Sequence, residues 1–223
     1  MAYVDFMSVV HSATKRDYLA RVNEPAFPKA KAAVLAKQWG FDYWDGDRKI
    51  VYGGYRYIVG RWEKVARAMA AHYGLKAGDR VLDVGCGKGF QLFDLTKVVP
   101  GIEVYGLDIS EYAIANAKEE IKDRLQVGNA TSLPFPDHHF DLVFSLTTLH
   151  NLHCYDLDKA LREVERVGKK NKYICVESYR NEEEKANLLY WQVTCEAFNT
   201  PEEWEWWFKQ TGYTGDHSLI YFE

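Results

Sequence analysis

The sequence is poor in cysteine, and its four cysteines, Cys86, Cys154, Cys175 and Cys195, lie far apart. No two form a CxxC pair, and no Cys/His spacing matches a metal-ligand pattern, so we expect no metal site. Within an apolar run, a reduced thiol behaves as a small hydrophobic side chain. The cysteines therefore predict a cytoplasmic protein with reduced thiols.

Long apolar runs and a basic stripe are also missing. No window approaches the roughly 18 apolar residues of a membrane-spanning helix, and the first residues lack the pattern of a signal peptide. The formal net charge is −4 and the pI is about 6.0, with lysines and arginines scattered among acidic neighbours. These features argue against a membrane span and against nucleic acid as a partner.

Apolar residues are plentiful, at 47% of 223 residues, which is enough for the core of one generous domain. From residue 80 onward, strand-like runs alternate with helix-like segments. We expect strands at 80–86, 103–110, 125–130, 140–149, 172–178 and 217–223, and helices at 89–99, 111–121, 156–168, 181–198 and 201–212. This alternation predicts an α/β fold in which helices cover both faces of a mostly parallel sheet.

The segment 41–62 fits no single regular element, since it holds four glycines and seven aromatic residues. Such a segment can close irregularly over a ligand, because glycines permit hinge motion. We interpret residues 1–60 as an N-terminal helical and aromatic cap or lid, and residues 61–223 as one catalytic domain.

Three glycines follow the first predicted strand, in the stretch VLDVGCGKGF at 81–90. Ligands of open parallel sheets bind at the carboxyl ends of the strands, so this turn is the place to look. A dinucleotide site has the spacing GxGxxG, whereas here the third glycine comes one position early and Phe90 takes its place. The loop permits close approach of a ligand but is not laid out for phosphate.

Asp108 ends the second predicted strand, nineteen residues after Gly89. A carboxylate at that position can accept hydrogen bonds from both hydroxyls of a ribose. The glycines and Asp108 together predict a ligand that contains adenosine but no pyrophosphate.

The segments VLDVGCGKGF, YGLDIS, GNATSLPFPDHHFDLVFS and LHNL resemble, in order and spacing, the motifs of class I S-adenosylmethionine-dependent methyltransferases. The resemblance covers roughly residues 61–223 and is closest to the small-molecule branch. It implies a Rossmann-like sheet of seven strands whose last strand, 217–223, runs antiparallel. It also implies S-adenosylmethionine as cofactor, S-adenosylhomocysteine as product, and a small-molecule acceptor, and it is compatible with a homodimer.

The resemblance also implies cofactor-binding residues. Asp83 would border the methionine part of the cofactor, Asp108 its ribose and Ile109 its adenine. Asn129 stands where the family often has an acidic residue, although its amide oxygen can still accept a hydrogen bond from the adenine amino group. The predicted set is Asp83, Gly85, Cys86, Gly87, Gly89, Asp108, Ile109, Asn129, Ala130 and Leu146, to which the aromatic segment 50–62 adds Tyr57 and Arg61 on its own residues.

Methyl transfer requires an aligned acceptor, a dry site and, for some acceptors, removal of a proton. We predict His150, after the fourth strand, and Tyr52, in the cap, as catalytic residues, with a packing role for His150 as the alternative. The predicted acceptor-binding residues are Tyr55, His153, Glu177, Tyr190 and Trp191. Tyr190 and Trp191 could equally be core residues of their helix.

Other functions fit the sequence less well. Aminopropyl transfer would need acidic residues after the fourth strand, where LTTLHNL is nearly neutral, and a nicotinamide oxidoreductase disagrees with Phe90. Two alternatives stay open: a protein side chain as acceptor, and a non-catalytic, cofactor-binding partner subunit. The sequence does not choose among O-, N- and C-methylation.

Overall fold

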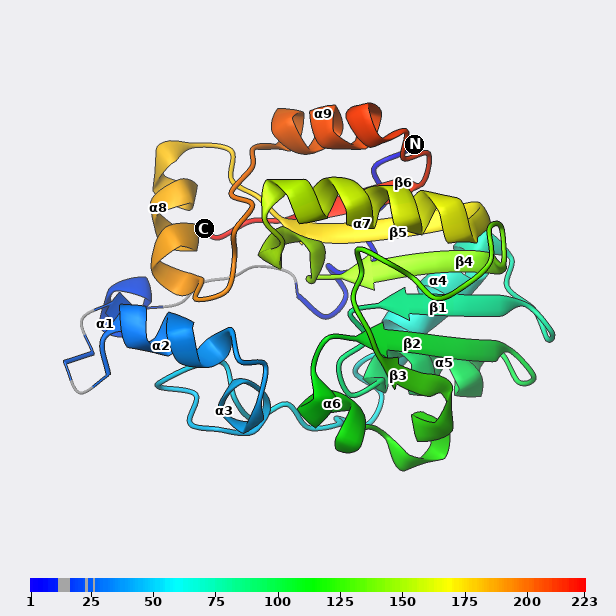
Figure 1. Ribbon diagram of the computed structural model, residues 1–223, viewed down its shortest axis with the longest axis horizontal. Helices are drawn as coiled ribbons and strands as arrows, with labels where there is room; N and C mark the ends of the chain where they lie inside the picture. Colours follow the sequence, from blue (N-terminus) through cyan, green and yellow to red (C-terminus); the bar gives the residue numbers. More distant parts are fainter. Residues whose placement is uncertain (12–16, 23, 26) are drawn as a thin grey trace.

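The computed structural model describes residues 1–11, 17–22, 24–25 and 27–223. In this part of the chain one sheet has six strands in the order β3-β2-β1-β4-β5-β6, and all neighbouring strands run parallel (Figure 1). The strands are β1 (Arg80–Val84), β2 (Glu103–Asp108), β3 (Leu125–Val127), β4 (Phe140–Leu146), β5 (Gly168–Glu177) and β6 (Asp216–Ile220).

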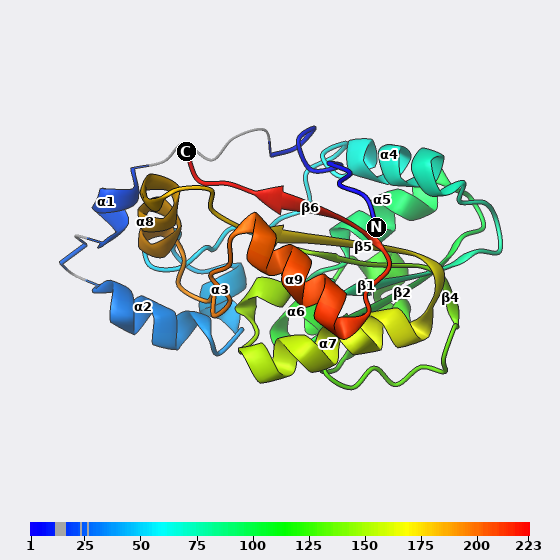
Figure 2. The ribbon, with the colours of Figure 1, turned by 90° about the horizontal axis from the view of Figure 1, so that it is seen from above.

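Apolar residues at alternate strand positions give the sheet two buried faces. Val81 and Leu142 belong to the core under α4 (Glu63–Tyr73) and α5 (Phe90–Val98), whereas Leu82 and Val143 belong to the opposite core. The second core lies under α7 (Cys154–Val167) and α9 (Pro201–Thr211), on the other side of the sheet in Figure 2. The predicted α/β fold with helices on both faces of a parallel sheet is therefore confirmed.

The prediction of seven strands with an antiparallel last strand is wrong. β6 pairs parallel with β5, with Tyr173 opposite Asp216 and Glu177 opposite Ile220. The connection between them carries α8 (Glu182–Trp191) and α9, and α9 runs back along the sheet toward the amino ends of the strands (Figure 1). β6 therefore starts from the same side as β5, as in a crossover connection.

Two predicted helices are shorter in the structure, because backbone N–H groups within them donate to other parts of the chain. The helix expected at 111–121 becomes α6 (Glu111–Ala115) and the 3-10 helix η1 (Glu119–Arg124), with the Lys118 N–H bonded to the Lys88 carbonyl at 2.9 Å between them. The helix expected at 181–198 ends with α8, because the Val193 N–H donates to the Tyr52 hydroxyl at 3.1 Å.

The N-terminal residues extend the sheet edge. The Val4 N–H donates to the His217 carbonyl at 2.9 Å, and the His217 N–H donates to the Ala2 carbonyl at 3.0 Å. Tyr3 thereby forms a parallel bridge with His217 on the outer side of β6. The first residues of the segment 1–60 thus protect an edge strand from unwanted pairing.

The helices of that segment lie beyond the carboxyl ends of the strands (Figure 1). The segment contains α1 (Tyr18–Val22), α2 (Lys29–Ala36) and α3 (Phe41–Trp44). Of these, α1 lies against α8. Residues 12–16, 23 and 26 of the predicted cap lie outside the described residues. None of the helices described is both long and apolar enough to cross a bilayer.

Candidate active site

A cavity of about 270 Å³ opens at the carboxyl ends of β1, β2 and β4. It brings together most residues that the sequence assigned to the cofactor. Those on its wall are Asp83, Gly85, Cys86, Gly87, Asp108, Ile109, Asn129, Ala130 and Leu146. Tyr55, predicted to bind the acceptor, lies on the same wall.

The first two positions of the loop require glycine for two reasons, backbone conformation and space. Gly85 and Gly87 have positive φ, +85° and +54°, which other residues rarely adopt. A Cβ on Gly85 would lie 2.2 Å from Thr148 Oγ1, and one on Gly87 would lie 2.6 Å from Trp44 Cη2. The loop is therefore packed tightly between β4's end and the cap.

The third glycine has a packing function. Gly89 caps α5 and does not line the cavity, and a Cβ there would lie 2.8 Å from Leu125 Cδ1. The sequence assigned Gly89 to the cofactor; in the structure its missing Cβ leaves room for the side chains of Leu125 and Ile121.

We expect Gly85→Ala to lower the free energy of unfolding by about 2 kcal/mol or more, because it adds a steric overlap to backbone strain. The matched control is Gly78→Ala, since Gly78 has the same φ of +85° but open space around its Cβ position. Chemical denaturation of both variants measures the difference. Equal destabilisation would show that the contact with Thr148 costs nothing.

Asp108 joins the glycine loop to the end of β2. Its Oδ2 accepts the Gly87 N–H at 2.7 Å and its Oδ1 accepts the Ser110 N–H at 2.8 Å, and the side chain is 7% exposed. Burial raises the pKa of Asp108, and these two donors oppose the rise. Each oxygen keeps a further acceptor position for a ligand hydroxyl.

Three buried oxygens on the cavity wall lack a donor among the described residues: Asp83 Oδ1, Gln91 Oε1 and, at the border with the second cavity, Asn151 Oδ1. Burial, and then the charge of Asp108, raise the pKa of Asp83 well above its usual range. A buried acceptor without a donor is costly, so the wall fits a ligand that carries N–H donors and positive charge. The sequence did not predict Gln91, whose only signal is its place in the first turn after the glycines.

The cap covers this cavity and is bonded to the glycine loop and to Ser110, which follows β2. Trp44 Nε1 donates to Ser110 Oγ at 2.8 Å. Lys88, which is 7% exposed, directs its ammonium group to both carboxylate oxygens of Asp45 at 2.7 Å and to the Tyr55 carbonyl at 3.0 Å. Because Asp45 holds Lys88, the lysine is directed to the cap, and Asp83 and Asp108 dominate the charge of the cavity wall.

A second cavity, of about 340 Å³, adjoins the first. The residues shared by both walls are Tyr43, Tyr55, Trp62, Phe90, Thr147 and Asn151. Tyr52, His150, Glu177 and Trp191 line the second cavity, as expected of acceptor-site residues. Arg61, which the sequence assigned to the cofactor, lines this second cavity and not the first.

The boundary between the two cavities is strained and incompletely hydrogen-bonded. Thr147 has a φ of +53°, which is costly for a β-branched residue. Asn151 is in the 3-10 helix η2 (Leu149–Asn151), and its buried Oδ1 has no partner within the described chain. Strain and unpaired polar atoms of this kind are typical of functional sites. Neither residue was predicted.

A polar network lies on the inner wall of the second cavity. The Glu177 N–H donates to His150 Nδ1 at 3.4 Å, which leaves the proton of neutral His150 on Nε2, 3.5 Å from Glu177 Oε2. Gln192 Nε2 donates to the same carboxyl oxygen, and the Tyr52 hydroxyl donates to Gln192 Oε1. The cap is thereby connected to the end of β5.

The pKa values of the two titratable groups in this network, His150 and Glu177, are shifted in opposite directions. Burial lowers the pKa of His150 to about 3, so its imidazole is neutral and both of its nitrogens are engaged. Burial raises the pKa of Glu177 to about 8, against the Gln192 hydrogen bond. A carboxyl group with this pKa is partly ionised near neutral pH, and its carboxylate form can accept a proton, whereas His150 has little affinity for one.

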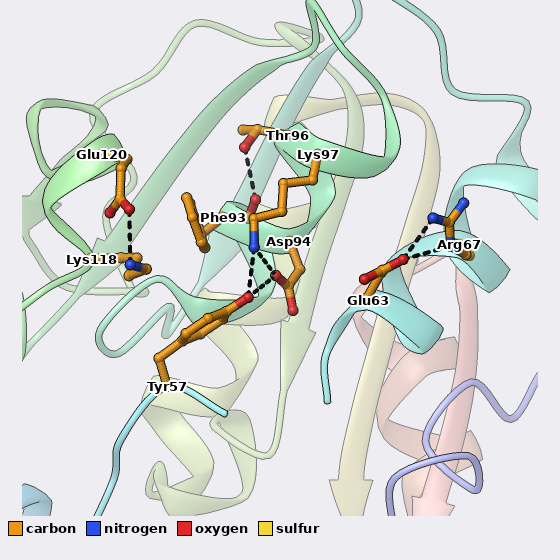
Figure 3. A network of polar contacts seen from close by, with 9 residues as sticks. All are labelled: Tyr57, Glu63, Arg67, Phe93, Asp94, Thr96, Lys97, Lys118 and Glu120. Atoms are coloured by element: carbon orange, nitrogen blue, oxygen red, sulfur yellow. Dashed lines mark hydrogen bonds and ion pairs between the residues drawn. The ribbon is translucent and has the colours of Figure 1, made fainter. Parts of the chain in front are cut away.

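Three other predicted site residues lie away from both cavities. Figure 3 shows the Tyr57 hydroxyl turned toward α5, where it donates to Asp94 and accepts from Lys97 Nζ at 2.7 Å. His153 caps α7 with its ring largely exposed, 3.6 Å from the Glu196 carboxylate. Tyr190 is exposed on α8. Tyr57 therefore attaches the cap to α5, and the other two residues face solvent.

Comparison with known proteins gives a consistent result. Residues 75–212 match the family described as "Methyltransferase domain". The demethylmenaquinone methyltransferase of Symbiobacterium thermophilum is 38% identical over 129 residues, which are 54% of this chain and 51% of that protein. The 27-O-demethylrifamycin SV methyltransferase of Amycolatopsis mediterranei is 31% identical over 149 residues, 62% of this chain and 51% of that protein. The chain thus spans about half the length of these relatives.

A solved structure also resembles this chain. The YcgJ protein of Bacillus subtilis aligns with a TM-score of 0.54 and 26% identity, covering 66% of each chain.

Proposed function

This chain belongs to the family of methyltransferase domains, and we propose that it transfers a methyl group from S-adenosylmethionine to a small-molecule acceptor. The observation that carries the proposal is the pair of adjoining cavities at the carboxyl ends of the strands. One wall offers buried carboxylates to a cationic ligand, and the other offers a buried group that can take a proton.

The residues present fit S-adenosylmethionine. We assign its ammonium group to Asp83 and Gln91, whose buried oxygens lack donors among the described residues. Asp108 would hold the ribose hydroxyls, and Ile109, half exposed on the cavity wall, would pack on the adenine beside Asn129. When bound, this cofactor supplies a methyl group that its sulfonium charge has already activated.

The chain's own residues would orient the acceptor, exclude water and remove a proton. The rings of Tyr43, Tyr55 and Trp62, on both walls, shield the passage between the cavities. The acceptor's nucleophilic atom would take the methyl group that this cofactor supplies, and the proton that the atom gives up would pass to the Glu177 carboxylate. His150 acts as a positioning residue, since its Nε2–H faces that carboxylate.

We expect cofactor binding to release a proton and to strengthen as pH rises. Burial raises the pKa of Asp83, so the free protein tends to hold a proton that the cofactor's ammonium group must displace. With one proton released, affinity rises by at most about tenfold per pH unit. Calorimetry in two buffers of different ionisation enthalpy measures the release. Asp83→Asn should abolish it, and an equal release from this variant would contradict the assignment.

The proposed function is tested with the purified protein, S-adenosylmethionine, and cytosol of the source organism separated by molecular size. Formation of S-adenosylhomocysteine is followed in each fraction. We expect turnover with the small-molecule fraction. Turnover only with the protein fraction would replace the small molecule by a protein side chain, and cofactor binding without any turnover would indicate a non-catalytic subunit.

A further inference from the structure

The second cavity has an unequal distribution of charge on its wall. Arg48 and Arg56 from the cap and Arg61, the residue after it, line the cavity, whereas Glu177 is the one acidic residue among the described residues on that wall. The arginines come from residues 48–61, and Glu177 comes from the end of β5. One side of the cavity is therefore cationic, and the side formed by the sheet carries the proton acceptor.

These three arginines differ from the other arginines whose side chains the structure describes. Each of the others is within ion-pair distance of a carboxylate: Arg67, Arg80, Arg124, Arg162, Arg166 and Arg180. Among the described residues no carboxylate pairs with Arg48, Arg56 or Arg61. Glu63 and Arg67, one turn apart on α4, show the usual arrangement in Figure 3.

Unpaired guanidinium groups around one cavity favour an anionic ligand. The planar fork of an arginine matches a carboxylate or a phosphate and binds it through two parallel hydrogen bonds. The remaining wall includes Trp62, Trp191 and Phe222, which suit an apolar or ring-shaped body. The cavity thus matches a molecule that is anionic at one end and nucleophilic at the other.

We propose that the acceptor is a small molecule with a carboxylate or phosphate group, which Arg48, Arg56 and Arg61 bind, and with its proton-bearing nucleophile at the Glu177 side. This inference rests on the proposed methyltransferase function, because it assigns the second cavity to the acceptor. It goes further in that it makes these arginines the determinants of acceptor choice.

The test uses the full chain saturated with S-adenosylhomocysteine, with saturation established first by calorimetry. Two pairs of probes differ only in the anionic group: 4-hydroxybenzoate with 4-hydroxybenzamide, and phenyl phosphate with phenol. Tryptophan fluorescence reports binding, since Trp62 and Trp191 line the cavity. We expect at least one acid to bind about tenfold or more tightly than its neutral partner. The acid that does so identifies carboxylate or phosphate as the group.

Substitutions of single arginines then test which side chains bind the anionic group of the probe. Arg48→Gln and Arg56→Gln should each weaken binding of the acid about fivefold or more, leave the neutral probe unchanged, and leave S-adenosylhomocysteine affinity within about threefold. Arg67→Gln is the matched control, because Arg67 lines neither cavity, and it should change nothing.

Equal binding of the acid and its neutral partner by the unmodified chain would overturn the inference, as would failure of every acid to bind the loaded protein. Loss of acid binding in Arg67→Gln as well would also overturn it. A chain that does not bind S-adenosylhomocysteine at all would refute the proposed function itself, and the first calorimetric step detects this separately.

Discussion

Replacing Asp108 with alanine should weaken S-adenosylmethionine binding by about 30-fold or more, which corresponds to roughly 2 kcal/mol. The carboxylate is buried and already orders the glycine loop through the Gly87 and Ser110 N–H groups. Its loss would remove the proposed acceptor of the ribose hydroxyls and leave those two N–H groups without a partner. Calorimetric titration gives the affinity, and the melting temperature should fall as well.

The matched control is Asp141→Ala. Asp141 also accepts a backbone hydrogen bond, from the Arg80 N–H at 2.9 Å, but it lies at the amino end of β4, away from both cavities. This variant should lose stability and keep its cofactor affinity. If Asp108→Ala also kept its affinity, the ribose assignment would be refuted.

Replacing Glu177 with glutamine should lower turnover by about 100-fold or more while cofactor affinity stays within about threefold. The amide keeps the size of the carboxyl group but cannot accept the acceptor's proton. Glu177 lines the second cavity only, so its loss leaves the cofactor wall intact. Single-turnover kinetics with the acceptor fraction measures the change.

The pH dependence of turnover provides a separate check. The carboxylate form of Glu177 is the active one, and burial raises its pKa to about 8, so turnover should rise as pH increases through about 8. The Glu177→Gln variant should lose this rise of turnover with pH, which is the acid limb of the pH profile. The His150→Ala variant should still show a rise of turnover with pH, but at a shifted pH, because His150 positions Glu177. Its turnover should be slower, and its cofactor binding should be unchanged. Survival of the limb in Glu177→Gln would assign the proton transfer to another group.

The fold could be predicted where the signal was local. Strand-like runs alternated with helix-like segments, and Gly85, Gly87 and Asp108 fell at strand ends, so the edge of the sheet where the first cavity opens followed from chain order alone. The direction of β6 could not be predicted from chain order, because it depends on the path that the connection takes through α8 and α9.

The site was predictable on the sheet side and less so on the cap side. Asp83 and Asp108 follow from their strands, whereas the direction of a side chain in the irregular segment 41–62 depends on how the cap docks. Tyr55 and Tyr57 illustrate this: two residues apart, one lines both cavities and the other is bonded to Asp94 on α5. No periodicity in that segment separates them.

The two cavities differ in which part of the chain supplies their polar groups. Asp83, Gln91 and Asp108 lie inside the span 75–212 that matches the family, whereas the arginines of the second cavity lie before it. If the second cavity binds the acceptor as proposed, substitutions at these arginines would alter acceptor preference and leave the polar groups of the first cavity unchanged. Under the proposed assignment, such a division would let descendants of one ancestral gene diverge toward new acceptors while selection on methyl-donor binding stays unchanged.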